Sequence, residues 1–279
     1  MDAYQSFAGV YDQFMDNVPY DGWSDRIHRI LLSYGIDSGL VLDLGCGTGQ
    51  MTRRLRNMGY DMIGVDGSPD MLQIALEKEE DVPLTAGDPG GETPQGDAAA
   101  RKQGPAPRIL YLEQDIRAFE LYGTVRAVIS VCDCLNYLGS AEDLLQVFRL
   151  AENYLDPGGV LVFDMNTEHY YSQVLGQNTY ADVRDECSVI WENDNDPEQK
   201  EHEYDLTIFL RRESGLYERS QETHIEKAYS PGTVKSLAEQ AGLIFEGVYD
   251  GYTERKLSGE SDRMVFVFRE SDRKLRQGR

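Results

Sequence analysis

A glycine-rich turn between two apolar segments is the part of this sequence whose residue types point most directly to chemistry. The apolar run over residues 41–44 stops at three alternating glycines, Gly45, Gly47 and Gly49, and residues 49–57 are expected to form a helix. Glycine tolerates positive φ and has no Cβ, so the backbone can turn sharply and a ligand can lie against it. The free N–H groups at the start of the helix would face that ligand. Such a turn is typical of a site for a nucleoside-bearing cofactor.

A carboxylate stands at the end of the next apolar segment. Residues 63–66 read Ile-Gly-Val-Asp, which predicts a second strand that ends at Asp66. A carboxylate at that place can accept both hydrogen bonds of a ribose diol. The turn and Asp66 together favour a ligand that contains ribose, the alternative being a tight strand–helix turn without a ligand.

The spacing of the glycines separates two classes of cofactor. A dinucleotide site requires G-x-G-x-x-G or G-x-G-x-x-A, whose last small residue packs the helix against the strand. Here the third glycine comes one position early, and Gln50 occupies the place of the small residue. The form D-x-G-x-G-x-G, with Asp43 as its acid, instead resembles motif I of class I S-adenosylmethionine-dependent methyltransferases.

Further segments match this family in order. Residues 109–116 are expected to form a third strand that ends in Asp115 and Ile116, and in the family this acid hydrogen-bonds the adenine amino group. Residues 125–131 predict a fourth strand, which leads into the position of motif IV. A helix over 141–155, a Pro-Gly-Gly turn and a fifth strand over 160–164 complete the pattern.

The N-terminal segment narrows the resemblance. Residues 7–15 and 18–23 look like the opening F-A-x-V-Y-D-x-x-M … P-Y-x-x-W of a small bacterial group, which includes sugar N,N-dimethyltransferases and YqeM-like enzymes. In that group, N-terminal helices cover the cofactor. Tyr11 and Trp23 could stabilise the sulfonium, because an aromatic face attracts a cation by about 0.5–2 kcal/mol. The alternative is that Tyr11, Tyr20 and Trp23 only pack the helices onto the sheet.

The resemblance assigns roles to particular residues. It implies S-adenosylmethionine as cofactor and S-adenosylhomocysteine as product, with substrate contacts at Asn136 and Tyr137. Methyl transfer displaces a neutral leaving group, so the protein must mainly align the nucleophile and, where needed, accept its proton. His169 is the candidate base, with Asp133 as the second catalytic candidate, and the alternative for His169 is a position at the surface or behind the site. The implied cofactor-binding residues are Tyr11, Trp23, Asp43, Gly45, Cys46, Gly47, Gly49, Asp66, Gly67, Asp115, Ile116 and Cys132.

These elements predict an α/β fold: a Rossmann-like, seven-stranded, mostly parallel sheet with helices on both faces and an inserted antiparallel β lid. Alternating β-branched and aromatic residues predict lid strands over 188–192, 203–210 and 216–229, and residues 243–250 and 264–268 predict a reversed final hairpin. The expected units are an N-terminal helical cap over 1–36, the methyltransferase core over 37–164 and 231–270, the β lid or substrate subdomain over 165–230, and a flexible tail over 271–279.

Two segments depart from a minimal fold of this kind. Residues 81–108 are rich in Pro, Gly and Ala and cannot bury enough apolar surface to offset the entropy of ordering. We expect a disordered insertion there, with a partner-binding loop as the alternative. The β lid over 165–230 is expected to select the substrate, although it could also serve as an oligomerisation surface.

Charge and composition limit the partners. The formal net charge of −22 opposes binding to a polyphosphate backbone, so no direct nucleic-acid partner is expected. The sequence has no apolar run of about 18 residues, so no membrane span is expected. The polar, acidic N-terminus is unlike a signal peptide, and we therefore expect a cytoplasmic location. The four cysteines and four histidines show neither a disulfide framework nor metal-ligand spacing, so no catalytic metal is expected.

The leading prediction is a methyltransferase that acts on a small molecule through an N, O or S nucleophile. A cofactor-binding regulatory or assembly protein without robust catalysis is one alternative, and a methyltransferase that reaches RNA or protein through a partner is another. An NAD-linked oxidoreductase is disfavoured by Gln50 and by the lack of a Ser/Tyr-x-x-x-Lys pair after the fourth strand. Both a monomer and a homodimer fit the sequence.

Overall fold

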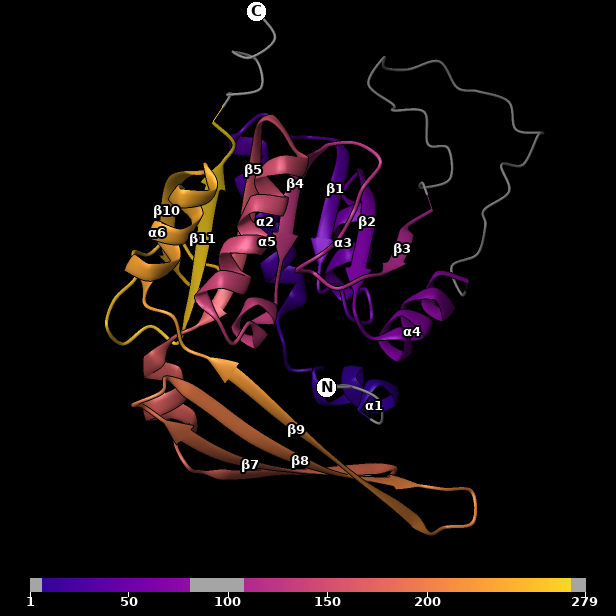
Figure 1. The fold of residues 1–279 in the computed structure, drawn as a ribbon. Coiled ribbons are helices and arrows are strands. Elements are labelled where there is room, and N and C mark those ends of the chain that lie inside the picture. Colours follow the sequence, from indigo (N-terminus) through magenta and orange to yellow (C-terminus); the bar gives the residue numbers. More distant parts are fainter. Residues whose placement is uncertain (1–6, 81–107, 272–279) are drawn as a thin grey trace, which may run out of the picture.

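The computed structural model describes residues 7–80 and 108–271. The insertion predicted over 81–108 and the tail predicted over 271–279 therefore lie outside the described residues, apart from residues 108 and 271 themselves. Within the described part, the chain forms one large sheet flanked by helices and a second, smaller sheet at one end of it (Figure 1).

The large sheet confirms the predicted Rossmann-like core. Its strands lie in the order β10-β11-β5-β4-β1-β2-β3, and β11 runs antiparallel to both of its neighbours, as the reversed final hairpin requires. The other neighbouring pairs are parallel. The strands are β1 (Gly39–Leu44), β2 (Tyr60–Asp66), β3 (Leu110–Glu113), β4 (Val125–Ser130), β5 (Leu155–Asn166), β10 (Ile244–Asp250) and β11 (Arg263–Arg269).

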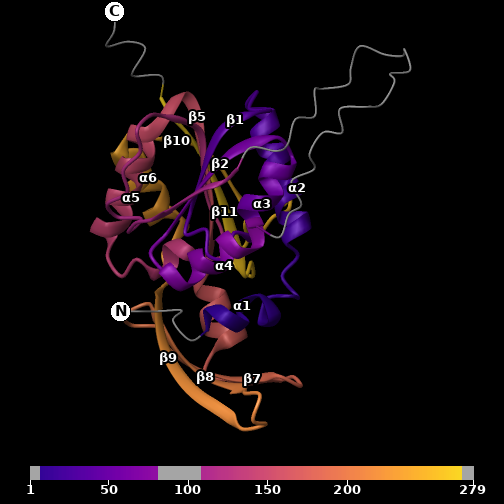
Figure 2. The same cartoon turned by 90° about the vertical axis from the view of Figure 1, so that its right-hand side faces the viewer.

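Helices cover both faces of this sheet, because its strands are apolar on both sides. Side chains alternate along β1, so that Val41 packs toward α2 and α3 and Leu42 packs toward α5 and α6. Figure 2 shows α2 and α3 on one side of the sheet and α5 and α6 on the other. The helices are α1 (Ala8–Phe14), α2 (Tyr20–Ser33), α3 (Gln50–Asn57), α4 (Pro69–Glu80), α5 (Ala141–Tyr154) and α6 (Pro231–Ala241).

The small sheet is inserted between β5 and α6, and we call it the lid. Its four antiparallel strands are β6 (Thr179–Val183), β7 (Cys187–Asp196), β8 (Glu201–Arg211) and β9 (Tyr217–Lys227). The sequence predicted only the last three of these, because β6 is an almost wholly exposed edge strand without a buried alternation. The Asn and Asp residues over 193–196 are of types that favour turns, but they pair with β8 and extend β7, so that ladder hydrogen bonds outweigh local turn preference.

Helix α1 lies between the lid and the core (Figure 1). Phe7 and Val10 pack against the lid residues Val189 and Ile208 in one buried cluster. The Phe7 N–H also donates to Oε1 of Glu222 on β9 over 2.9 Å. The lid is thus held against the N-terminal helix rather than directly against the large sheet at this place.

The opposite side of α1 is tied to the glycine turn. The Asp12 carboxylate accepts hydrogen bonds from Oγ1 of Thr48 (2.7 Å) and Nε2 of Gln50 (2.8 Å), and it forms an ion pair with Lys78 on α4. Although burial opposes its charge, the bonds from these three residues lower the pKa of Asp12. Helix α1 therefore links the lid to the turn between β1 and α3.

A buried carboxyl joins the turn's first strand to its helix. Asp43 is fully buried in β1 and accepts a hydrogen bond from Oγ1 of Thr52 on α3 over 2.6 Å. Burial raises the pKa of Asp43 to about 7, and the bond from Thr52 offsets only part of that effect. The group consequently keeps its proton in the folded protein at pH values where it is ionised in the unfolded chain.

This difference predicts a pH-dependent stability. The contribution of protonated Asp43 to the free energy of unfolding is fully present below its pKa in the unfolded chain, near 3.8. It is lost as the pH rises through the pKa in the folded protein, about 7. The free energy of unfolding of the wild type should thus fall relative to that of Asp43→Asn, by at most about 1.4 kcal/mol per pH unit. Asparagine resembles the protonated carboxyl, so this variant lacks the titration.

Urea unfolding of both proteins at steps between about pH 4 and about pH 8 measures the difference. Asp61→Asn is the control, because it removes an exposed carboxylate from the neighbouring strand β2. A wild-type advantage that stays constant or grows with pH would contradict the proposed burial effect at Asp43.

Candidate functional site

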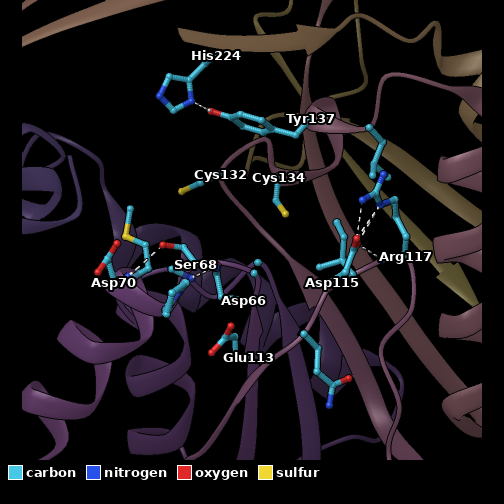
Figure 3. A pocket seen from close by; sticks show the side chains of 18 of the residues that line it. Asp66, Ser68, Asp70, Glu113, Asp115, Arg117, Cys132, Cys134, Tyr137 and His224 are labelled. Atoms are coloured by element: carbon cyan, nitrogen blue, oxygen red, sulfur yellow. Dashed lines mark hydrogen bonds and ion pairs between the residues drawn. The ribbon is translucent and has the colours of Figure 1, made fainter. Parts of the chain in front are cut away.

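A pocket of about 1000 Å³ lies where the parallel strands end (Figure 3). Its walls come from the turn after β1, the ends of β2 and β3, the loop after β4, helix α1 and lid strand β9. Ligands of open α/β sheets bind at the carboxyl ends of the strands. The lid and α1 lie on the side of the strand ends away from the large sheet (Figure 1), and residues of both line the pocket.

Different physical constraints require glycine at the three positions of the turn. All have positive φ values of 71°, 52° and 74° at Gly45, Gly47 and Gly49. A Cβ at Gly45 would lie 2.1 Å from Sγ of Cys134, and one at Gly49 would lie 2.4 Å from the hydroxyl of Tyr111. A Cβ at Gly47 would meet nothing within 4 Å, and Gly47 lines the pocket. Packing thus excludes side chains at the outer two positions, whereas the middle one is open to a ligand.

Asp66 is placed by backbone hydrogen bonds at the end of β2. Its Oδ2 accepts from the Gly47 N–H and its Oδ1 from the Ser68 N–H, both over 2.8 Å. Burial raises the pKa of Asp66, and the backbone bonds from Ser68, Gly47 and Gly67 oppose that rise. Each carboxylate oxygen has two lone pairs, so both oxygens can still accept a ligand hydroxyl. The neighbouring Gly67 also lines the pocket.

Asp115 and Ile116 line the pocket just after β3. The Asp115 carboxylate pairs with the Arg117 guanidinium over 2.5 Å, and this bond is the main reason why the pKa of Asp115 is lowered. Among the described residues that line the pocket, Arg117 is the one arginine or lysine, whereas five carboxylates line it: Asp66, Asp70, Glu113, Asp115 and Asp143. The walls are therefore suited to a ligand with positive charge.

The loop after β4 brings two thiols to the pocket wall. Cys132 lines the pocket, as do Cys134 and Tyr137 of the short 3₁₀-helix η1 (Cys134–Tyr137). Burial raises the pKa of both thiols well above their ordinary value, so they remain protonated at neutral pH. Asp133 has its carboxylate 2.8 Å from the Arg263 guanidinium and is not among the residues that line the pocket.

The lid contributes a histidine that sequence reasoning missed. His224 of β9 lines the pocket between Thr223 and Ile225, and its Nδ1 lies 3.1 Å from the Tyr137 hydroxyl (Figure 3). Its ring stacks on Tyr204 at 4.8 Å between centroids. Sequence reasoning missed it because β9 lies far along the chain from the glycine turn. The pattern that could have revealed it is the alternation along β9, in which every second residue is buried although it is polar: Glu222, His224 and Glu226.

His224 and Tyr137 belong to a larger network of buried polar side chains. The Tyr137 hydroxyl lies 2.6 Å from that of Tyr204, which donates to Oε1 of Glu226 over 3.2 Å. Glu226 also accepts from the Tyr171 hydroxyl of η2 (Tyr170–Leu175), a single-turn π-helix. Burial raises the pKa of Glu226 to about 8. A chain of exchangeable protons therefore runs from the pocket into the lid.

Several residues predicted for the site lie behind it. Trp23 stacks on Tyr252 at 4.5 Å with Arg263 above it, and these three residues line a second cavity of about 530 Å³. Asn136 is fully buried, where Nδ2 donates to the Lys227 carbonyl and Oδ1 accepts from the Asn166 N–H. Of the predicted residues, those lining the pocket are Tyr11, Gly45, Gly47, Asp66, Gly67, Asp115, Ile116, Cys132 and Tyr137, and those outside its lining are Trp23, Asp43, Cys46, Gly49, Asp133, Asn136 and His169.

The predicted base His169 lies beside Asp262, in the segment between β10 and β11. Its Nε2 is 3.8 Å from Oδ1 of Asp262, and the side chain is partly exposed.

No helix in the described ranges is long and apolar enough to cross a membrane. Within the same ranges, no group of three His, Cys, Asp or Glu side chains could hold a metal ion.

Comparison with known proteins identifies the family. A family model described as a methyltransferase domain matches residues 14–245. The Bacillus subtilis (strain 168) protein named "Putative methyltransferase YqeM" is 29% identical over 269 residues, which are 96% of this chain and 97% of that protein. A dTDP-3-amino-3,4,6-trideoxy-alpha-D-glucopyranose N,N-dimethyltransferase of Streptomyces venezuelae is 26% identical over 159 residues, 56% of each chain.

A solved structure agrees with this result. The crystal structure of an S-adenosylmethionine-dependent methyltransferase from Clostridium acetobutylicum superposes with a TM-score of 0.78 at 27% identity, covering 96% of this chain and 99% of that one. These similarities confirm the resemblance that the glycine turn and the later motifs indicated. The chain belongs to the methyltransferase family and is an enzyme of that family.

Proposed function

We propose that this enzyme transfers the methyl group of S-adenosylmethionine to a nitrogen, oxygen or sulfur atom of a small molecule bound under the lid. One observation carries the proposal: the pocket that holds Gly47 and Asp66 on one wall has Thr223, His224 and Ile225 of the lid on another. The cofactor turn and the lid therefore face a common space of about 1000 Å³, which is the size of a small-molecule site.

The positions of the carboxylates suggest how the cofactor lies. Asp66 at the end of β2 can accept the ribose hydroxyls, and Asp115 with Ile116 at the end of β3 can meet the adenine ring. The sheet order β4-β1-β2-β3 then leaves the glycine turn and the loop after β4 for the methionyl half. Bound S-adenosylmethionine supplies an electrophilic methyl group on a sulfonium, and the acidic walls and Tyr11 favour that positive charge.

The relatives support a small acceptor. The Streptomyces venezuelae relative is named for a dTDP-amino sugar, and the fold of the chain resembles that of a sugar N-methyltransferase with a TM-score of 0.70. An amine acceptor attacks the methyl group through its free lone pair, so a protonated amine must first give its proton to a nearby base. His224 and Tyr137 both line the pocket and hydrogen-bond each other.

Two histidines are candidates for accepting that proton. His224 lines the pocket, whereas His169 lies outside the lining beside Asp262. A general base must come within hydrogen-bond reach of the proton that it takes, directly or through one water. We therefore favour His224, assisted by Tyr137, over His169, and Asp133 is less suited because Arg263 holds its carboxylate.

An acceptor screen tests the function. We expect methyl-labelled S-adenosylmethionine to yield a singly or doubly methylated product with one class of small molecule, starting from dTDP-amino sugars, simple amines, phenols and thiols. Mass spectrometry of the products measures the transfer. Tight cofactor binding without transfer to any of these classes would contradict the small-molecule acceptor, and would favour a regulatory protein or an enzyme whose partner presents RNA or protein.

The open space around Gly47 predicts that a side chain placed at this position would block cofactor binding. Gly47→Asn should weaken S-adenosylhomocysteine binding by about 10–100-fold, because the new side chain projects into the pocket and overpacking costs about 1–3 kcal/mol. Asparagine tolerates the left-handed backbone, so the fold should survive. Calorimetric titration measures the affinity.

Gly35→Asn is the matched control for Gly47→Asn. Gly35 also has positive φ and open space around its Cβ position, but it does not line the pocket. We expect the affinity of this control to equal that of the wild type. Equal losses in both variants would point to backbone strain, and no loss in Gly47→Asn would place the cofactor elsewhere.

Replacing the two histidines separates their roles. With the acceptor found in the screen, His224→Gln should lower turnover by about 10²–10⁴-fold, because a general base contributes that much, and it should leave S-adenosylhomocysteine affinity nearly unchanged. His169→Gln should retain turnover close to that of the wild type. Steady-state rates for both variants decide the assignment, and the reverse pattern would transfer the role to His169.

A further inference from the structure

Two consecutive residues after β4 have a backbone conformation that side chains disfavour. Cys132 has φ of 58° and Asp133 has φ of 53°, both in the left-handed region, and neither is glycine. Such a conformation costs free energy and persists only where the surroundings hold it in place. Strained residues of this kind are concentrated at functional sites, and Cys132 lines the cofactor pocket.

A single carboxylate accepts the N–H groups of both strained residues. The Asp133 N–H donates to Oδ1 of Asp164 over 2.8 Å, and the Cys132 N–H donates to Oδ2 over 3.3 Å. Successive backbone N–H groups that converge in this way form a concave anion site. Here the anion is a side chain of the neighbouring strand β5, which is paired with β4.

The Asp164 carboxylate is itself fixed from the other side. Oδ2 accepts from the Tyr252 hydroxyl over 2.6 Å and from the Arg263 guanidinium over 2.9 Å. Arg263 also bonds Asp133, and Trp23 lies beneath the guanidinium. Burial opposes the charge of Arg263, but the carboxylates of Asp164 and Asp133 outweigh it and raise the pKa of the guanidinium. Asp164 is thus buried, paired and unable to shift freely.

We propose that Asp164 is a positioning residue that sets the loop over residues 131–134 against the methionyl half of the cofactor. The inference rests on the proposed function, which puts adenine and ribose at β3 and β2 and leaves the β4 side for that half. Asp164 is not among the residues that line the pocket, so it acts through the backbone of Cys132 and Asp133.

The test compares two cofactor fragments in Asp164→Asn. Asparagine keeps the size of the side chain but has one acceptor oxygen in place of two, so one loop N–H loses its partner. Affinity for S-adenosylhomocysteine should fall by about tenfold or more, since hydrogen bonds to charged groups have that effect. Affinity for 5′-methylthioadenosine, which lacks the amino-acid end, should stay within about twofold. Calorimetric titration measures both affinities.

Tyr252→Phe is the matched control, because it removes a donor to Asp164 and leaves both acceptor oxygens for the loop. We expect it to bind both ligands with nearly wild-type affinity. If Asp164→Asn does not fold, Asp164→Glu tests the same point, because it keeps the charge for Arg263 but moves the carboxylate away from the loop N–H groups. The same selective loss is expected in that variant.

A second readout links the effect to the strained backbone. Glycine adopts the left-handed conformation at no steric cost, so Cys132→Gly added to Asp164→Asn should restore part of the lost affinity for S-adenosylhomocysteine. The double-mutant cycle should therefore be non-additive. Equal losses for both ligands, or no loss, would overturn the role of Asp164. Failure of the wild type to bind S-adenosylhomocysteine would instead overturn the proposed function.

Discussion

The close approach of the backbone at the end of β1 to its neighbours is the constraint on which the site depends. Any side chain at Gly45 would collide with Cys134, and any at Gly49 would collide with Tyr111. In the same turn, the N–H groups of Gly45 and Cys46 donate to the Val65 carbonyl over 2.8 and 3.0 Å. The turn is therefore anchored to β2 directly beside Asp66. That anchoring leaves Gly47 as the open position where a cofactor can lie.

The remaining walls of the pocket come from segments that are far apart in the chain. Helix α1 contacts the turn through Asp12 and contacts the lid through Phe7, whose N–H is bonded to Glu222. The lid in turn presents His224 to the pocket and is joined to the core through Asn136, which bonds the Lys227 carbonyl. Any displacement of the lid must therefore change contacts at α1 and at η1. The acceptor site and the cofactor turn are mechanically connected through these two bridges.

The core, its cofactor turn and three of the four lid strands could be predicted from the sequence, but strand β6 and several side-chain positions could not. Strands β1 and β2 are buried along most of their length and read as apolar runs, and Asp66 is the last residue of β2. Asp115 and Ile116 follow the partly exposed edge strand β3, and the order of the family's motifs predicted their place. Strand β6 is exposed along most of its length and has no such signal. His224 was missed because β9 lies far along the chain from the glycine turn and from its partner Tyr137 in η1. The stacking of Trp23 on Tyr252 could not be predicted, because Tyr252 lies in the segment between β10 and β11 and no local sequence pattern pairs the two residues.

A crystal structure with S-adenosylhomocysteine tests the central claim most directly. The account predicts ribose hydroxyls hydrogen-bonded to Asp66, adenine beside Asp115 and Ile116, and the sulfur between the loop after β4 and His224. The methyl position would then face the lid, with room for an acceptor. A ligand bound in another cavity, or bound here with its adenine at the β4 side, would contradict the account of how this pocket works.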